Sequence, residues 1–222
     1  YLSFAVAQKE PTRSDFTDRY KFAADDTYPS SEKLYDWELG YQYTAPRLSL
    51  GVNLYYMKYK DQLVPTGMVN DDSNALNTNV PDSYRRGVEL SASWRATGWF
   101  TVGANATFSQ NRIESYVDAL KDSPTYGKEL GDMTIAYSPD VIANAFLNFH
   151  HRGFEAVFHT QHVGKQYFTN NENDALSLDA YCVTNLNLAY TFRTRSARSV
   201  RLGLLINNLF NAEYESNGYG YS

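Results

Sequence analysis

The sequence has little sulfur and no long apolar run. Cys182 is its only cysteine, which excludes an internal disulfide framework. No stretch reaches 18 consecutive apolar residues, so no membrane-spanning helix is predicted. The first ten residues have neither a basic start nor an apolar centre, which argues against a signal peptide there. Lys and Arg total 20 against 25 Asp and Glu, and this acidic balance argues against a nucleic-acid partner.

Motifs that carry enzymatic or metal chemistry are also missing. The sequence has no P-loop, no GxGxxG, no CxxC pair and no defensible Ser–His–Asp order, so no enzyme is predicted. His150 and His151 flank a predicted short turn. His159 and His162 fall on opposite faces of one predicted strand, and ligands on opposite faces cannot chelate one ion. We therefore predict no metal site, no haem ligation and no cofactor.

Aromatic residues, by contrast, are abundant, and Tyr supplies 19 of the 34. Many of them alternate with polar residues at a period of two. Residues 35–43 place five apolar side chains on one face of an extended chain and four polar or small ones on the other. This spacing is typical of a β-strand with one apolar and one polar face. The mean hydropathy of −0.51 is low because half of each such strand is polar.

The same pattern recurs and predicts an all-β chain of about nine strands. The predicted strands are 1–8, 34–45, 47–63, 83–95, 99–114, 136–150, 153–164, 180–193 and 200–214. The connections alternate strictly between short turns and long polar loops. The long loops are predicted at about 9–33, 64–82, 115–135 and 165–179.

This alternation favours an antiparallel transmembrane β-barrel with up-and-down strands, short periplasmic turns and long extracellular loops. Aromatic residues lie at both ends of the apolar faces, where the two membrane interfaces are expected. Lys58 and Lys60 continue the apolar face beyond Tyr56, at a level predicted to lie above the membrane. Several strands approach 15 residues, or roughly 50 Å. Plugged barrels of that height have about 22 strands, so nine strands predict part of one.

Six segments, in order along the chain, resemble the C-terminal half of the barrel of a TonB-dependent outer-membrane receptor of a Bacteroides-like style. The most specific is the asparagine-rich stretch "NNLFNAEYESNGYGY" at 207–221. The other five segments are "SFAVAQKEPTRSDFTD" (3–18), "LYDWELGYQY" (34–43), "LYYMKYKDQLV" (54–64), "SYRRGVELSASW" (83–94) and "VGKQY" (163–167).

The resemblance implies that residues 1–222 are a C-terminal part of such a barrel, without the plug domain and without the final strand. It implies a multi-pass protein of the Gram-negative outer membrane that takes up a scarce ligand with energy from the inner membrane. The ligand class would be an iron-siderophore, haem, cobalamin or an oligosaccharide. The implied partners are outer-membrane lipid, the protein's own N-terminal plug, the TonB energy-transducing protein that acts through that plug, and the small-molecule ligand.

Two sets of polar residues are candidates for the site. The first set lies in the loops or at strand ends and is predicted to contact ligand: Glu10, Arg13, Asp15, Tyr167, Asn170 and Asn171. An internal network that orders the barrel rim is the competing interpretation for the first three. The second set lies on the polar faces and is predicted to face the lumen or the plug: Asp36, Glu38, Asn53, Arg85, Glu89, Asn105, Asn187 and Asn207.

Two other functions fit parts of the pattern. One is a soluble, Tyr-rich, all-β carbohydrate-binding module, which would need no membrane. The other is a passive porin-like channel, which would have no plug. Acidic loops such as residues 70–74 could also bind calcium, but their spacing matches no EF-hand, and a solvated loop is the preferred interpretation.

Overall fold

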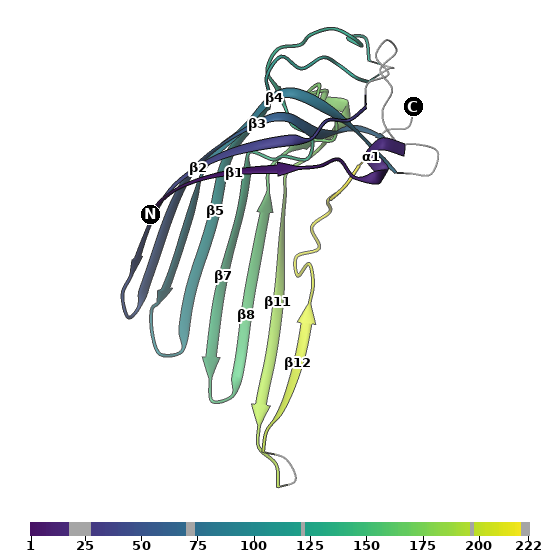
Figure 1. Ribbon diagram of the computed structural model, residues 1–222. Coiled ribbons are helices and arrows are strands. Elements are labelled where there is room, and N and C mark those ends of the chain that lie inside the picture. Colours follow the sequence, from purple (N-terminus) through teal and green to yellow (C-terminus); the bar gives the residue numbers. More distant parts are fainter. Residues whose placement is uncertain (18–27, 70–73, 121–122, 196–197, 219–222) are drawn as a thin grey trace.

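The computed structural model describes residues 1–17, 28–69, 74–120, 123–195 and 198–218. Within these residues the chain forms one large curved antiparallel sheet, in which nine strands follow one another in sequence order (Figure 1). This confirms the all-β, up-and-down prediction. The nine strands are β1 (Leu2–Lys9), β2 (Glu32–Thr44), β3 (Leu48–Val69), β4 (Ala75–Arg95), β5 (Phe100–Ile113), β7 (Val141–His151), β8 (Phe154–Val163), β11 (Tyr181–Phe192) and β12 (Val200–Ile206).

The remaining elements are short and lie at the loop end of the sheet. A two-residue strand, β6 (Met133–Thr134), pairs with the end of β5. A two-stranded hairpin joins β9 (Gln166–Tyr167) to β10 (Ser177–Leu178), with the 3₁₀ turn η1 (Asp174–Leu176) between them. One helix, α1 (Arg13–Thr17), lies in the first predicted long loop. None of the helices in the described residues is long and apolar enough to cross a membrane.

The strand register separates an apolar face from a polar face. Val52 pairs with Tyr41 on one side and Leu90 on the other. Its neighbour Asn53 pairs with Glu89 on the opposite face. Tyr41 is 66% exposed and Leu90 is 43% exposed, so the apolar face has no protein core against it. Such a face is stable in lipid rather than in water.

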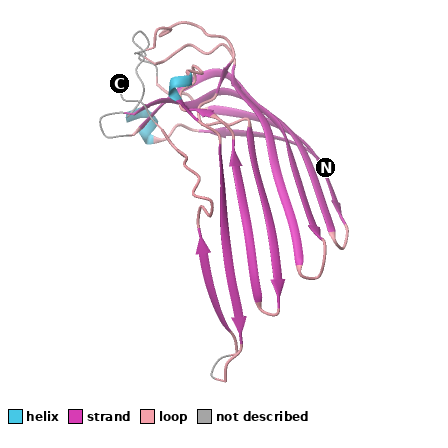
Figure 2. Cartoon of the chain, turned by 180° about the vertical axis from the view of Figure 1, so that it is seen from behind, coloured by secondary structure: helices cyan, strands magenta, loops and turns pink. Residues whose placement is uncertain are grey.

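The tight turns all lie at one end of the sheet and the long connections at the other, as both views show (Figures 1 and 2). The β7–β8 turn is formed by Arg152 and Gly153, whose φ angles are +48° and +85°. Two successive positive φ values are typical of the type I′ turn that closes antiparallel hairpins. Aromatic rings gather beside these turns: Phe100 and Phe149 stack with centroids 4.6 Å apart. The short–long alternation predicted from the sequence is thus confirmed for the connections after β1, β5 and β8, but not for the one between β3 and β4.

The predicted loop at 64–82 is wrong. β3 continues to Val69 and β4 begins at Ala75, so the two strands form a long hairpin above the apolar region. The register shifts between Pro65 and Val69, and Gly67 has a φ of +83°. Pro and Gly are found in strands at such irregularities. They suggested a loop in the sequence, but here they bend a strand that is paired on both sides of the irregularity.

Two predicted strands are too long. The strand predicted at 136–150 begins only at Val141, after a positive φ of +54° at Tyr137. The strand predicted at 200–214 ends at Ile206, because Asn208 and Asn211 adopt φ angles of +50° and +52°. Asn tolerates this left-handed conformation better than most residues. Five residues of the predicted loop at 9–33 form α1 instead.

The buried apolar core lies among the loops. Val64, Val80, Ile113, Tyr116 and Ile135 form one buried cluster, against which Leu130 and Met133 pack. These side chains come from the β3–β4 hairpin, the outer end of β5 and the connection that follows it. The loop end is therefore a packed structure in its own right, held by ordinary hydrophobic burial.

Candidate functional site

A polar trough runs along the polar face of β2 to β5. It consists of two adjoining hollows of about 340 and 410 Å³ that share Asn53, Glu89 and Thr107. Glu38 and Arg85 line the hollow nearer the loops. Asn105 lines the other hollow. The structure thus brings together five of the eight residues that the sequence predicted to face the lumen.

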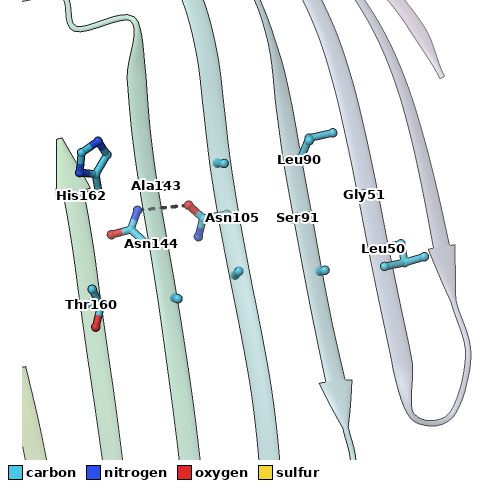
Figure 3. A pocket seen from close by; sticks show the side chains of 13 residues that line it. Leu50, Gly51, Leu90, Ser91, Asn105, Ala143, Asn144, Thr160 and His162 are labelled. Atoms are coloured by element: carbon cyan, nitrogen blue, oxygen red, sulfur yellow. Dashed lines mark hydrogen bonds between the residues drawn. The ribbon is translucent and has the colours of Figure 1, made fainter. Parts of the chain in front are cut away.

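Hydrogen bonds across neighbouring strands fix the amides of this trough. The side-chain amide of Asn53 donates to Oε2 of Glu89 at 3.2 Å and accepts from the Tyr1 hydroxyl at 3.0 Å. Nδ2 of Asn144 donates to Oδ1 of Asn105 at 3.1 Å (Figure 3). Because each amide is held by a neighbour on the next strand, the lining of the trough is well ordered.

The hollow nearer the loops, called the upper hollow from here on, contains one cationic side chain among its lining residues, Arg85. The other hollow of the trough is called the lower hollow. Nη1 of Arg85 donates to Oδ1 of Asn111 at 3.4 Å and to Oγ of Ser138 at 3.2 Å. Both acceptors are neutral, and no described carboxylate forms an ion pair with this guanidinium. Guanidinium groups bind carboxylates and other anions through charge-assisted hydrogen bonds. Arg85 can therefore bind an anionic group that enters this hollow.

The sequence analysis missed several residues that line the upper hollow, among them Tyr137 and Ser138. Tyr137 and Ser138 enter it from the segment before β7, which was predicted to be a strand. The backbone N–H of Tyr137 donates to the carbonyl of Tyr167 at 2.8 Å, and its hydroxyl donates to the carbonyl of Gly218. Pro139 is the signal that could have indicated this break, because proline is rare inside a paired strand.

The other predicted lumen residues lie apart from the trough. Asp36 lies on the polar face of β2, and its Oδ1 is buried without a hydrogen-bond partner among the described residues. Asn187 lines a separate hollow of about 320 Å³ beside Glu155 and Arg201. Asn207 lies in a bend beyond the end of β12, so its predicted place within a strand is wrong. Its contact with the lumen or the plug stays a prediction.

Asn170, predicted to contact ligand, is fully buried. Its Oδ1 accepts from the backbone N–H of Ala136 at 2.7 Å. Its Nδ2 donates to the carbonyl of Pro65 at 2.7 Å, 105 residues away along the chain. The side chain therefore joins its own loop to the outer end of β3 and to the segment before β7. Its assignment to ligand binding stays a prediction without support from this geometry.

Tyr167 and Asn171 also make contacts within their own loop. The Tyr167 hydroxyl donates to Oδ1 of Asp174 at 3.2 Å, and Asn171 accepts from the hydroxyl of Thr169 at 2.8 Å. Both side chains keep some exposure. Their role in ligand binding stays a prediction.

Glu10, Arg13 and Asp15 are close in sequence but have separate partners. Glu10 accepts from the hydroxyl of Ser31 at 2.5 Å. Asp15 accepts from the backbone N–H of Thr12 at 2.7 Å and from Nδ2 of Asn77 at 2.9 Å. No ion pair joins Arg13 to either carboxylate. The rim is thus tied by hydrogen bonds to neutral groups, and the predicted ligand contact of these three residues stays a prediction.

A further hollow lies on the apolar face and has a different character. It has a volume of about 530 Å³, with Ala92, Ala104, Ala106, Ala143 and Ala145 in its lining. Figure 3 shows Leu50 and Leu90 on one side of it and Thr160 and His162 on the other. Small side chains on the apolar face create this hollow, so we assign it to the lipid boundary and not to the candidate site.

The loop core contains a buried carboxylate. Asp118 accepts from the backbone N–H of Leu120 at 3.0 Å and from the hydroxyl of Thr125 at 2.6 Å. Burial by itself raises the pKa of this carboxyl, but the hydrogen bonds outweigh burial and lower the pKa below its ordinary value of 3.8. In the described part of the chain, no three His, Cys, Asp or Glu residues are grouped so that they could hold a metal ion.

We expect Asp118 to make the loops sensitive to acid. A carboxyl whose pKa is lowered by folding stabilises the folded state above its unfolded pKa, and this stabilisation is lost as the pH falls through the folded pKa. Pepsin cleavage of the loops, relative to cleavage of an unfolded reference protein at the same pH, should therefore increase from about pH 5 to about pH 2. In Asp118→Asn this increase should be smaller, because the titrating group is gone. Asp132→Asn, at an exposed position, is the control; equal acid sensitivity in both variants would contradict the assignment.

The chain was compared with known families and solved structures. A family model described as "TonB dependent receptor-like, beta-barrel" matches residues 1–209. The copper transporter OprC is 20% identical, with a TM-score of 0.70 over 97% of this chain and 31% of that one. The ferric yersiniabactin uptake receptor FyuA from Yersinia pestis is 19% identical, with a TM-score of 0.67 over 99% and 31%.

A third similar structure is the ferric-catecholate import receptor Fiu from K12 E. coli, which is 17% identical. Its TM-score is 0.65 over 96% of this chain and 29% of that chain. The chain therefore spans about a third of the length of these solved relatives. At such low identities, the similarity to solved structures establishes only a shared fold. Membership of a family is established by the family model.

Proposed function

Since this chain belongs to the TonB-dependent receptor family through the barrel match over residues 1–209, we propose that it forms the C-terminal part of a receptor barrel that takes up a scarce ligand. Members of this family are transporters of the outer membrane, and no enzymatic activity is proposed. The observation that carries the proposal is the polar trough at the loop end of a sheet whose other face is apolar.

The proposed site is the upper hollow, between the loops and the polar trough. Glu38 and Glu89 provide two carboxylates there, and Arg85 provides a cation with neutral partners. Such a wall can bind a polar ligand that enters between the loops, and can then pass it to the lower hollow. Asn105 and the other polar-face residues would contact either this ligand or the N-terminal plug.

The ligand class is an iron-siderophore, haem, cobalamin or an oligosaccharide, and we place ferric siderophores first. Two solved relatives are described as receptors for ferric chelates, FyuA and Fiu, and a third, OprC, as a copper transporter. Many ferric chelates are anionic, and Arg85 offers a positive group to an anion. The proposed partners are outer-membrane lipid, the receptor's own plug, and the TonB protein, which supplies energy through that plug.

The test is uptake by cells that make the full receptor. Uptake of a labelled ferric siderophore, haem, cobalamin or an oligosaccharide should be saturable and should stop when a protonophore collapses the inner-membrane potential. Uptake that continues with the protonophore present would favour the passive porin-like channel. A receptor found in the soluble fraction without detergent would favour the carbohydrate-binding module. The comparisons support neither alternative.

Arg85→Gln is expected to weaken ligand binding about 10- to 150-fold, because a hydrogen bond to a charged group contributes about 1.5–3 kcal/mol. The dissociation constant of the purified full receptor for its transported ligand is the measurement. Arg201→Gln is the matched control, since Arg201 also lies on the polar face but pairs with Glu155 near the short turns. An equal loss of affinity in both variants would contradict a specific role for Arg85.

A further inference from the structure

An aromatic belt crosses the apolar face near its loop end. Phe4, Trp37, Tyr56 and Tyr84, from β1 to β4, form a chain of rings with centroid distances of 5.1, 5.8 and 6.4 Å. Register places these residues on the same face as Leu54 and Val88, which lie one step further from the loops. Aromatic girdles of this kind lie at the membrane interface of transmembrane barrels.

Charged residues lie on the same face at and just beyond this belt. Lys58 forms ion pairs with Asp82 at 3.1 Å and with Glu114 at 2.8 Å. Lys60 shares Asp82 at 2.5 Å. These two lysines are therefore largely neutralised by acids of the protein itself.

Arg86 differs from these lysines. It pairs with Tyr56 across β3 and with Gln110 across β5, and thus lies within the belt. No carboxylate in the described residues forms an ion pair with it, and its side chain is exposed. A cation on a lipid-facing surface costs about 2–4 kcal/mol at the bilayer midplane and about 0–1 kcal/mol near the interfaces. Its position at the belt is therefore the level at which such a charge is tolerated.

The guanidinium of Arg86 is held in place. Nε and Nη2 both donate to Oε1 of Gln110, at 2.9 and 2.6 Å. The guanidinium carbon lies 5.3 Å from the centroid of the Tyr84 ring, in cation–π contact. A guanidinium has five N–H donors, so three remain for another partner. A planar, oriented guanidinium with free donors is well suited to a phosphate group.

We propose that Arg86 binds the phosphate of a phosphorylated lipid headgroup in the outer leaflet of the membrane. The argument is charge complementarity at the correct depth: an oriented cation without an acid partner, among interfacial rings, beside an apolar surface that acyl chains cover. The inference rests on the proposed outer-membrane function. It is separate from ligand uptake, because Arg86 and Arg85 lie on opposite faces of β4.

The test measures the binding of bisphosphorylated lipid A to the purified full receptor in mild detergent. Native mass spectrometry detects the bound lipid. Arg86→Gln should weaken this binding about tenfold, because it removes a charge-assisted contact. Arg47→Gln is the control, since Arg47 is exposed in the β2–β3 turn at the other end of the sheet, and it should bind as the unmodified receptor does. A lipid A analogue without phosphates should bind equally to the unmodified receptor and to Arg86→Gln.

Unchanged lipid A affinity in Arg86→Gln would overturn this inference, as would a loss of the same size with the phosphate-free analogue. These binding results are interpreted only for a receptor that inserts into bilayers as a folded barrel. Insertion is checked beforehand by the heat-dependent mobility of the barrel on gels. Failure of the unmodified receptor to insert would instead overturn the proposed membrane function. The two failures are therefore distinguishable.

Discussion

Val52→Arg is expected to block insertion of the full receptor into the outer membrane, whereas Asn53→Arg should insert far better. Val52 lies between Tyr41 and Leu90 on the apolar face, in the middle of the apolar part of β3. A charge there costs roughly 2–4 kcal/mol at mid-bilayer. Asn53 is the next residue along the strand and lies in the polar trough beside Glu89, where an added cation meets a carboxylate.

The measurement is the folded fraction in outer-membrane preparations, read from the heat-dependent mobility of the barrel on gels. Because the two substitutions differ by one position in the same strand, they add the same side chain to opposite faces. Equal insertion of both variants would reject the assignment of faces and, with it, the position of the candidate site. An insertion defect confined to Asn53→Arg would reverse that assignment.

Asn170→Ala is expected to loosen the loop end of the barrel. The substitution leaves the Ala136 N–H and the Pro65 carbonyl without their partner. A buried group that loses its hydrogen bond costs about 1–3 kcal/mol, so the two together cost about 2–6 kcal/mol. We expect the backbone amides near Ala136 and Met68 to exchange with deuterium faster by about 100-fold.

Hydrogen exchange with mass spectrometry of the full receptor in detergent is the measurement. Asn171→Ala is the matched control: its only bond to another loop in the described residues is a long one of 3.4 Å to Asp118, and exchange should change little. The β7–β8 region serves as an internal reference, because both variants leave that part of the sheet untouched. Equal exchange at Ala136 in Asn170→Ala and in the unmodified receptor would show that this amide does not hold the loops together.

The sheet was predictable from the sequence because apolar and polar side chains alternate along its strands at a period of two. Alternation placed Val52 and Asn53 on opposite faces, and the register confirms it. The same parity predicted that Glu38, Asn53, Arg85 and Glu89 share a surface. Membrane barrels allow this inference, because each strand has lipid on one side and the lumen on the other where it crosses the membrane.

The loop end was not predictable because its contacts join residues far apart in sequence. Pro65 and Gly67 are common in loops, and only the pairing of β3 with β4 shows that they sit in a strand. Asn170 resembled an exposed polar loop residue, but it is buried by segments more than 30 residues away. Tyr137 lines the trough because the chain is not a strand just before Val141, and Tyr137 itself has a positive φ angle. The alternation of apolar and polar residues alone does not reveal this interruption.

The burial of Asn170 has a consequence for the thermodynamics of ligand capture. The segments that meet at this residue, and the apolar cluster around Ile113, are packed by contacts within the protein itself. A ligand that docks against Tyr137 and Ser138 therefore meets side chains whose conformational entropy is already reduced. Binding to an ordered surface loses less entropy than binding that must first order a loop. For this part of the wall, selectivity should arise from shape and charge, with little contribution from loop closure.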